Sequence, residues 1–185
     1  MVAIQEPRRA RVAVRPALPG DAGAMERWRN EPSVRAHQPL QEATLGELRS
    51  DLARQRMDDL YRGCGERFQW IVLVDGESAG WITLAVLSWE HLLAEIGYAL
   101  STGHQGRGLM AQALGLVLPE LFVGAGIQRL EARCSIDNVA SQRLLERLGF
   151  VREGTLRSYF ELHGRRVDNY LYSLLKADYL PPRKP

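Results

Sequence analysis

The chain has 185 residues, of which 45% are hydrophobic and 25% charged, and this balance is typical of a single globular domain. Its 24 Lys and Arg residues against 22 Asp and Glu leave a formal net charge of +2, whereas a nucleic-acid-binding surface requires clustered basic residues. No apolar run approaches the ~20 residues that a membrane-spanning helix needs. We therefore expect neither nucleic acid nor a membrane among its partners.

The cysteines and histidines give no sign of a metal site. Cys64 and Cys134 are far apart in the sequence, and the four His residues show neither HxxxH nor HExxH spacing. Residues 1–15 are basic but lack the continuous apolar segment of an export signal. We therefore expect no bound metal and a cytoplasmic location, where thiols stay reduced.

The first half of the chain is predicted to form one strand, two helices and then three strands. The predicted strands are 12–15, 68–74, 79–87 and 92–100, and the predicted helices are 21–30 and 43–62. Asp75-Gly76, between two strand-like runs, is a strong hairpin signal. Because strand side chains alternate, Glu95 is predicted to share a face with Gly97 and Ala99.

The second half begins with a glycine-rich turn at 103–108. It leads into a helix with one apolar stripe: Met110, Ala113, Leu114, Val117, Leu118 and Leu121. Pro119 lies inside this pattern and predicts a kink near Gly115, because a proline ring clashes with the carbonyl four residues earlier. The remaining predicted elements are a strand at 130–136, a helix from 138 to 149, and closing strands at 151–162 and 167–175.

The predicted order, β-α-α-β-β-β-α-β-α-β-β, indicates an α/β fold in which one mixed sheet carries helices on its faces. We expect a single domain over 11–179. The proline-rich segment 180–185 is predicted to be a loose C-terminal tail, since it can neither continue a helix nor join a sheet interior.

The turn at 103–108 has the features of a phosphate-binding site. A helix start leaves backbone amides unpaired, and the helix dipole favours an anion there. Gly106 and Gly108 let the backbone approach a ligand, and Arg107 adds a positive charge. The alternative is that the glycines only turn the chain, because neither a Walker A loop nor a GxGxxG motif is present.

Several motifs resemble one known family. Gln105-Gly106-Arg107-Gly108-Leu109-Met110 resembles the pyrophosphate loop of the GCN5-related N-acetyltransferase (GNAT) superfamily, Gln/Arg-x-x-Gly-x-Gly/Ala, with Met110 at the last position. Asn138-x-x-Ser141, followed by Leu148-Gly149-Phe150, resembles its second motif. Residues 94–98 and 168–175 resemble strands of the subgroup that acetylates ribosomal-protein N-termini at alanine or serine. Together these similarities cover nearly the whole chain, about 11–179.

The resemblance implies a GNAT-like fold with a splayed central pair of parallel strands, which holds acetyl-CoA as the co-substrate. It places the pyrophosphate on the backbone amides of 105–110, and the pantetheine arm and acetyl carbonyl on the backbone of 98–100. Asn138 would bond the pantetheine or the adjoining phosphate region. The implied cofactor-binding residues are Tyr98, Ala99, Leu100, Gln105, Gly106, Arg107, Gly108, Leu109, Met110, Asn138 and Ser141.

Two residues are predicted to be catalytic. Ser141 is the predicted acid for the departing thiolate, by resemblance to its counterpart in the subgroup; the alternative is that Asn138 and Ser141 only cap a helix. Glu95 is the predicted base, because a carboxylate among apolar neighbours needs a partner or a task. The alternative for Glu95 is an ion pair with an arginine such as Arg133. Glu161 and Asp168 are weaker candidates.

The expected activity is transfer of an acetyl group from acetyl-CoA to a primary amine by direct attack, since Cys134 falls on the apolar side of its strand. An α-amine titrates near 7.7–8.0 and lysine near 10.4, so a protein N-terminus, such as that of a ribosomal protein, demands less of a base. The alternative acceptors are an amino acid, a polyamine or an antibiotic. Two other interpretations of the sequence are a non-catalytic acyl-CoA-binding module and a nucleotide-binding regulator. A homodimer could form through the closing strands or through an exposed apolar face.

Overall fold

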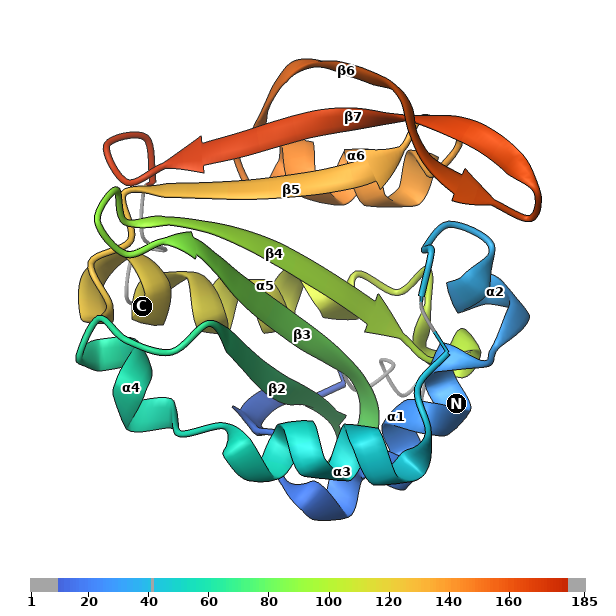
Figure 1. The fold of residues 1–185 in the computed structure, drawn as a ribbon, viewed down its shortest axis with the longest axis vertical. Helices are drawn as coiled ribbons and strands as arrows, with labels where there is room; N and C mark the ends of the chain where they lie inside the picture. Colours follow the sequence, from blue (N-terminus) through green and yellow to red (C-terminus); the bar gives the residue numbers. More distant parts are fainter. Residues whose placement is uncertain (1–9, 41, 180–185) are drawn as a thin grey trace, which may run out of the picture.

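The computed structural model describes residues 10–40 and 42–179, so the tail predicted at 180–185 lies outside the described residues. One seven-stranded sheet with helices on both faces forms the described part of the chain (Figure 1). Its strands and helices are β1 (Val12–Pro16), α1 (Ala22–Arg29), α2 (Pro32–Arg35), α3 (Leu45–Arg54), α4 (Met57–Tyr61), β2 (Arg67–Val74), β3 (Glu77–Ser88), β4 (Leu93–Leu100), α5 (Leu109–Pro119), β5 (Arg129–Ser135), α6 (Val139–Arg147), β6 (Val151–Leu162) and β7 (Arg165–Leu175).

The strand order across the sheet is β1-β2-β3-β4-β5-β7-β6. Every neighbouring pair is antiparallel except β4 and β5, which are parallel at the centre of the sheet. The fold class and the strand order along the chain that the sequence predicts are confirmed. The hairpin predicted at Asp75-Gly76 joins β2 to β3, and both residues have positive φ.

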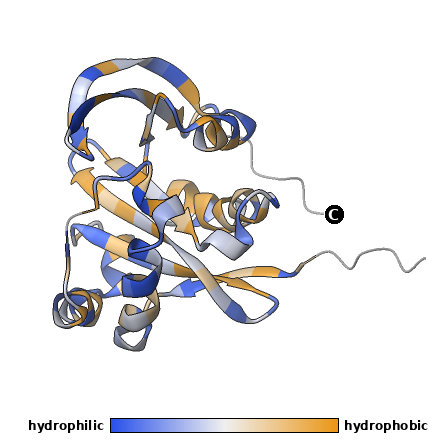
Figure 2. Cartoon of the chain, turned by 90° about the vertical axis from the view of Figure 1, so that its right-hand side faces the viewer, coloured by the Kyte–Doolittle hydropathy of each residue, from blue (hydrophilic) through white to orange (hydrophobic). Residues whose placement is uncertain are grey.

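Two apolar clusters hold the layers together. The larger cluster lies between the sheet and α5, where Leu114 and Val117 are at most 1% exposed. The smaller cluster lies on the opposite face beneath α1 and α3, where Trp28 stacks on Trp81 of β3 with ring centroids 6.2 Å apart. Figure 2 shows hydrophobic residues concentrated on the strands in the middle of the molecule, between these helical layers.

The helix predicted over 43–62 is wrong as one element, because the structure divides it into α3 and α4. Gln55 ends α3 with an extended backbone, φ −67° and ψ 127°. Its side-chain amide bonds both backbone groups of Gln69 in β2: Oε1 accepts from the amide N at 2.6 Å, and Nε2 donates to the carbonyl at 3.0 Å. A contact with a distant strand therefore overrides the local helix pattern. The short helix α2 was not predicted; Pro32 begins it, in the first-turn position that suits proline.

The helix after the glycine-rich turn ends in an irregular turn that the sequence did not predict. α5 runs without a break through Gly115 and ends at Pro119, and residues 120–124 continue as a π-helical turn. The irregular turn therefore follows the proline, and the kink predicted near Gly115 remains a prediction. Because Pro119 has no amide hydrogen, the hydrogen-bond pattern changes at this residue, and the Ala125 amide then donates to the carbonyl of Glu120.

Candidate active site

The central parallel strands diverge soon after they meet. β4 and β5 pair at three positions only, Leu93 with Arg129, Ala94 with Leu130, and Glu95 with Glu131. β4 then continues to Leu100 and β5 to Ser135 with no further pairing between them. The splayed parallel pair that the sequence predicts is confirmed, and its opening lies beside residues 96–100 of β4.

Two carbonyls of β4 face this opening, and a glutamine side chain satisfies each of them. Gln38 Nε2 donates to the Tyr98 carbonyl and Gln105 Nε2 to the Leu100 carbonyl, both at 2.8 Å. Buried backbone groups need partners, and at these positions a neighbouring strand would have supplied them. The sequence predicted a role for Gln105 through its backbone only, and it gave no signal for Gln38.

The glycine-rich turn ends directly at the start of α5. Gly106 and Gly108 have φ of 73° and 70°, and Gly108 is the N-cap of α5, with no side chain capping the helix. An added Cβ at either glycine would meet nothing within 4 Å. Open space therefore surrounds the two glycines that precede the first amides of α5, while Leu109 and Met110 turn their side chains into the core.

Gly80 is a structural residue of the site that the sequence analysis missed. It lies in β3 opposite Leu100, and an added Cβ would stand 2.2 Å from the Ala99 carbonyl oxygen and 2.8 Å from the Leu100 Cα. The close approach of β3 therefore fixes the end of β4 that borders the opening. A glycine inside a strand pattern was the available signal.

The segment before α2 is tied to the loop that follows β4. The Glu31 carboxylate accepts hydrogen bonds from the backbone amide and the hydroxyl of Thr102, both at 2.6 Å. Ser33 bonds Thr102 at 2.8 Å and accepts from Gln105 Nε2 at 3.1 Å. These contacts join residues about 70 positions apart, and local sequence patterns do not report them.

On the face of the sheet that carries α5 and α6, the second motif begins α6 and brings two hydroxyl groups together, those of Ser141 and Tyr98. Asn138 Oδ1 accepts from the Ser141 amide at 3.1 Å, so the helix cap considered for this pair is present. The cap leaves the Ser141 hydroxyl free of the helix, and it bonds the Tyr98 hydroxyl across the opening at 2.8 Å. Burial raises the pKa of Tyr98 well above its ordinary value, so its phenol keeps its proton at neutral pH.

Cys134 belongs to the same face and is buried in the larger apolar cluster, as its pattern predicted. Burial raises the pKa of its thiol to about 11, against a smaller opposite effect of the Ser141 hydroxyl. A thiol with this pKa carries almost no thiolate at neutral pH.

The opposite face of the same strands is charged. Arg133 of β5 forms ion pairs with Glu95 of β4 and with Glu131, the latter at 2.9 Å. Arg129 continues the network to Glu131 at 3.0 Å and to Glu153 of β6. The ion pair considered as the alternative for Glu95 is therefore present. The role of Glu95 as a base remains a prediction.

The two weaker acidic candidates lie apart from each other. Asp168 Oδ1 accepts from the Ser158 amide at 2.8 Å and so holds the bulge of β6. Glu161 lines an open pocket between the β6–β7 turn and the segment after α2, together with Arg35, Gln38, Pro39, Leu40, Leu162 and His163. Because Gln38 is also bonded to the Tyr98 carbonyl, this pocket adjoins the opening between β4 and β5.

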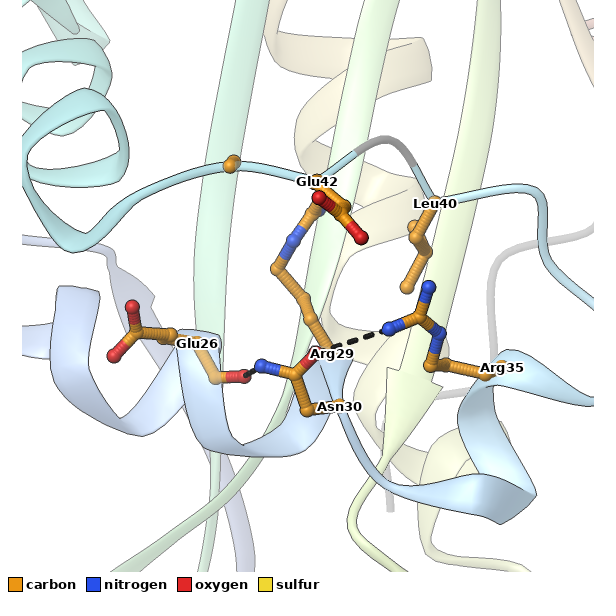
Figure 3. Close-up of a pocket in the computed structure, with 7 residues that line it drawn as sticks. Glu26, Arg29, Asn30, Arg35, Leu40 and Glu42 are labelled. Carbon is orange, nitrogen blue, oxygen red and sulfur yellow. Dashed lines mark hydrogen bonds between the residues drawn. The ribbon is translucent and has the colours of Figure 1, made fainter.

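A second pocket shares Arg35 and Leu40 with the first and extends over α1 (Figure 3). Glu26, Arg29, Asn30, Glu42 and Ala43 complete its lining. It includes no residue of β4, β5 or α6, which form the opening.

The fold and the site together define an enzyme class that binds an acyl-CoA in a split sheet. A family model described as an acetyltransferase (GNAT) domain matches residues 11–151. The chain belongs to this GNAT family and is an acetyl-CoA-dependent N-acetyltransferase.

Individual relatives agree with this assignment. The uncharacterized N-acetyltransferase p20 of Bacillus licheniformis is 31% identical over 159 residues, which cover 86% of this chain and 89% of that protein. The ribosomal-protein-serine acetyltransferase of Escherichia coli is 30% identical over 112 residues, 60% of this chain and 62% of that protein. The structure of Mycobacterium smegmatis RimJ in complex with CoA-disulfide is 25% identical, covers 89% of this chain and 81% of that one, and has a TM-score of 0.76.

Within the described ranges, no helix combines the length and the apolar character that crossing a bilayer requires.

Proposed function

We propose that the acceptor is the N-terminal α-amine of a protein, such as a ribosomal protein, and that the enzyme works in the cytoplasm. Relatives named as ribosomal-protein acetyltransferases support this choice, although each aligned segment covers only part of the chain. The acceptor's own chemistry supports it too. At pH 7 about a tenth of α-amines are neutral, and roughly 300-fold fewer lysines.

The observation that carries the proposed mechanism is the hydrogen-bonded pair of Tyr98 and Ser141 across the opening. Acetyl-CoA supplies the acetyl group as a thioester, and the open backbone at 105–110, the splayed end of β4 and Asn138 would hold it. The Ser141 hydroxyl holds a proton beside the opening and is the proposed acid. Its hydrogen bond to Tyr98 fixes the direction of that hydroxyl.

Direct attack of the amine is proposed over an acyl-enzyme. Cys134 is the cysteine beside Ser141, and its pKa of about 11 keeps it a neutral thiol. Acid and base then act from opposite sides, since Ser141 lies on the α6 side of the sheet and Glu95 on the charged side. A thioester lying in the opening would be accessible from both.

The acceptor is tested by acetyl transfer to peptides with free or blocked N-termini, with lysine inside some of them, together with spermidine and free amino acids, all read by mass. Acetylation confined to free N-termini is the expected result. Acetylation of lysine in the blocked peptides, or of spermidine alone, would overturn the proposal.

The role of Glu95 is tested against Glu131, because both carboxylates pair with Arg133. If Glu95 is the base, Glu95→Gln lowers kcat by about 10²-fold, whereas Glu131→Gln leaves kcat within a factor of three of the parent. If both substitutions keep kcat within a factor of three of the parent, Glu95 is not the base and serves only in the ion pair with Arg133.

A further inference from the structure

The pocket beside the opening has walls of opposite charge. Arg35 and Gln38 lie on the wall formed by the end of α2 and the segment after it, and Glu161 and His163 lie on the wall formed by the β6–β7 turn. Gln38 links this pocket to the reactive end of β4 through its 2.8 Å hydrogen bond to the Tyr98 carbonyl. A molecule in this pocket would therefore be next to the point at which the sheet opens.

Arg35 has an unusual position in the pocket. It is half-buried, and it forms the shared wall of the two adjoining pockets (Figure 3). Its Nη1 donates one hydrogen bond, to Asn30 Oδ1 at 3.2 Å, as drawn in Figure 3. Among residues 10–40 and 42–179, no carboxylate lies within 4.0 Å of this guanidinium, although Glu26 and Glu42 line the second pocket.

The surroundings of Arg35 carry further positive charge. Burial lowers the pKa of Arg29, and the charges of Arg67 and Arg35 lower it further. The positive charges of Arg67 and Arg35 therefore both repel the Arg29 guanidinium. In contrast to Arg35, Arg15 pairs with Asp21 at 2.7 Å, and Arg133 pairs with two carboxylates. An additional anion at Arg35 would relieve the repulsion and use donors that the protein leaves available.

We infer that Arg35 binds a carboxylate of the acceptor and so selects amines that carry a nearby negative charge. The inference rests on the proposed function and names its substrate class: an N-terminal peptide with Asp or Glu in its first residues, or a free amino acid with its α-carboxylate. Glu161 on the opposite wall complements the cationic end of such a molecule. An acceptor without a carboxylate, such as a polyamine, would leave the guanidinium without a counterion.

The test measures acetylation of peptides that compete for the enzyme and differ only in having Asp, Asn or Lys at the second or third position. Free amino acids are measured beside them. The enzymes compared are the parent, Arg35→Glu, Arg35→Gln and Arg35→Lys. Arg49→Glu is the matched control, because Arg49 is exposed on α3 and lines neither pocket. We expect the parent to favour Asp over Asn by about tenfold in kcat/KM. Arg35→Glu should reverse the preference toward Lys, Arg35→Gln should abolish it, and Arg35→Lys should keep part of it.

A reversal of preference cannot arise from partial unfolding, which lowers the rates for all peptides together. Acidic preference that survives in Arg35→Glu, or that is lost equally in Arg49→Glu, would overturn the inference. Acetylation of free amino acids alone, with Arg35→Gln raising their KM, would overturn the proposed protein acceptor and keep the role of Arg35. Acetylation of spermidine alone would overturn both.

Discussion

The two faces of β5 have opposite chemistry, although the same seven residues form both. Leu130, Ala132 and Cys134 face the α5–α6 side and are at most 5% exposed. The alternate residues Arg129, Glu131 and Arg133 form an ion-pair network on the other side. The apolar side of the opening, our proposed cofactor side, is therefore built from backbone groups and buried apolar residues, and the charged side, our proposed acceptor side, from long charged side chains. The first arrangement suits a constant ligand, and the second can be changed residue by residue.

The largest expected effect is on the cofactor side. Gly108→Val places a branched side chain at φ 70°, in the space that adjoins the first amides of α5. We expect acetyl-CoA affinity to fall by about 10²-fold or more, because strain and occlusion act together. Titration calorimetry measures this affinity. Gly103→Val is the control, since Gly103 lies in the same turn with ordinary φ and open space around it. Unchanged affinity in Gly108→Val would remove the loop from the cofactor site.

The next largest effect, at Ser141 and Tyr98 on the same side, separates the rate of the chemical step from the binding of acetyl-CoA. Ser141→Ala should lower kcat by about 10²-fold at saturating acetyl-CoA, because it removes the proposed acid. Tyr98→Phe removes the same 2.8 Å hydrogen bond but keeps the Ser141 hydroxyl, so its loss should be smaller, about tenfold or less. Steady-state and single-turnover rates distinguish the two. If Ser141→Ala keeps rates within a factor of three of the parent, Ser141 is not the acid and serves only in the start of α6.

Gln38 tests the boundary between the two sides. Gln38→Ala removes the hydrogen bond to the Tyr98 carbonyl and one side chain of the charged pocket. We expect the KM of the amine to rise by up to about tenfold, with acetyl-CoA affinity little changed. Gln128→Ala is the control, because the bond of this exposed glutamine is local, to the Gly126 carbonyl. A change in acetyl-CoA affinity with the amine KM constant would assign Gln38 to the cofactor side.

The sequence predicted the glycine-rich turn, the start of α5 and the start of α6 well because their determinants are local. The Gly106 and Gly108 conformations, the start of α5 and the Asn138–Ser141 cap each depend on residues within a few positions of one another. The order of strands follows from alternation and turn signals in the same way. These features need no knowledge of what lies across the sheet.

The acceptor side was not predictable in the same way, because distant residues meet there. Gln38 reaches Tyr98 across 60 positions, and Glu31 reaches Thr102 across 71. The error in the second helix has the same origin, since Gln55 leaves the helix to bond Gln69 in β2. Polar side chains with several possible partners carry little information until the fold brings one partner close.

The smallest effect concerns the stability of the charged face. Glu153 accepts from Ser173 Oγ at 2.6 Å and pairs with Arg129, and these contacts lower its pKa from 4.5 to about 2. Because its side chain is 37% exposed, solvent screening limits the pair to about 0.5–1 kcal/mol. A lowered folded-state pKa means that this stabilisation is complete above pH 4.5 and is lost as the pH falls toward 2.

Glu153→Gln should therefore lower the free energy of unfolding by this amount near neutral pH, and the difference from the parent should shrink between pH 4.5 and pH 2. Urea unfolding across that range measures it. Glu77→Gln removes the same charge from an exposed position at the start of β3 and serves as the control. The network is a rigid scaffold for Arg133 and Glu95 only if Glu153→Gln costs more than Glu77→Gln. Equal costs would mean that the charged face contributes solubility and substrate contacts, while the apolar face alone holds the opening in shape.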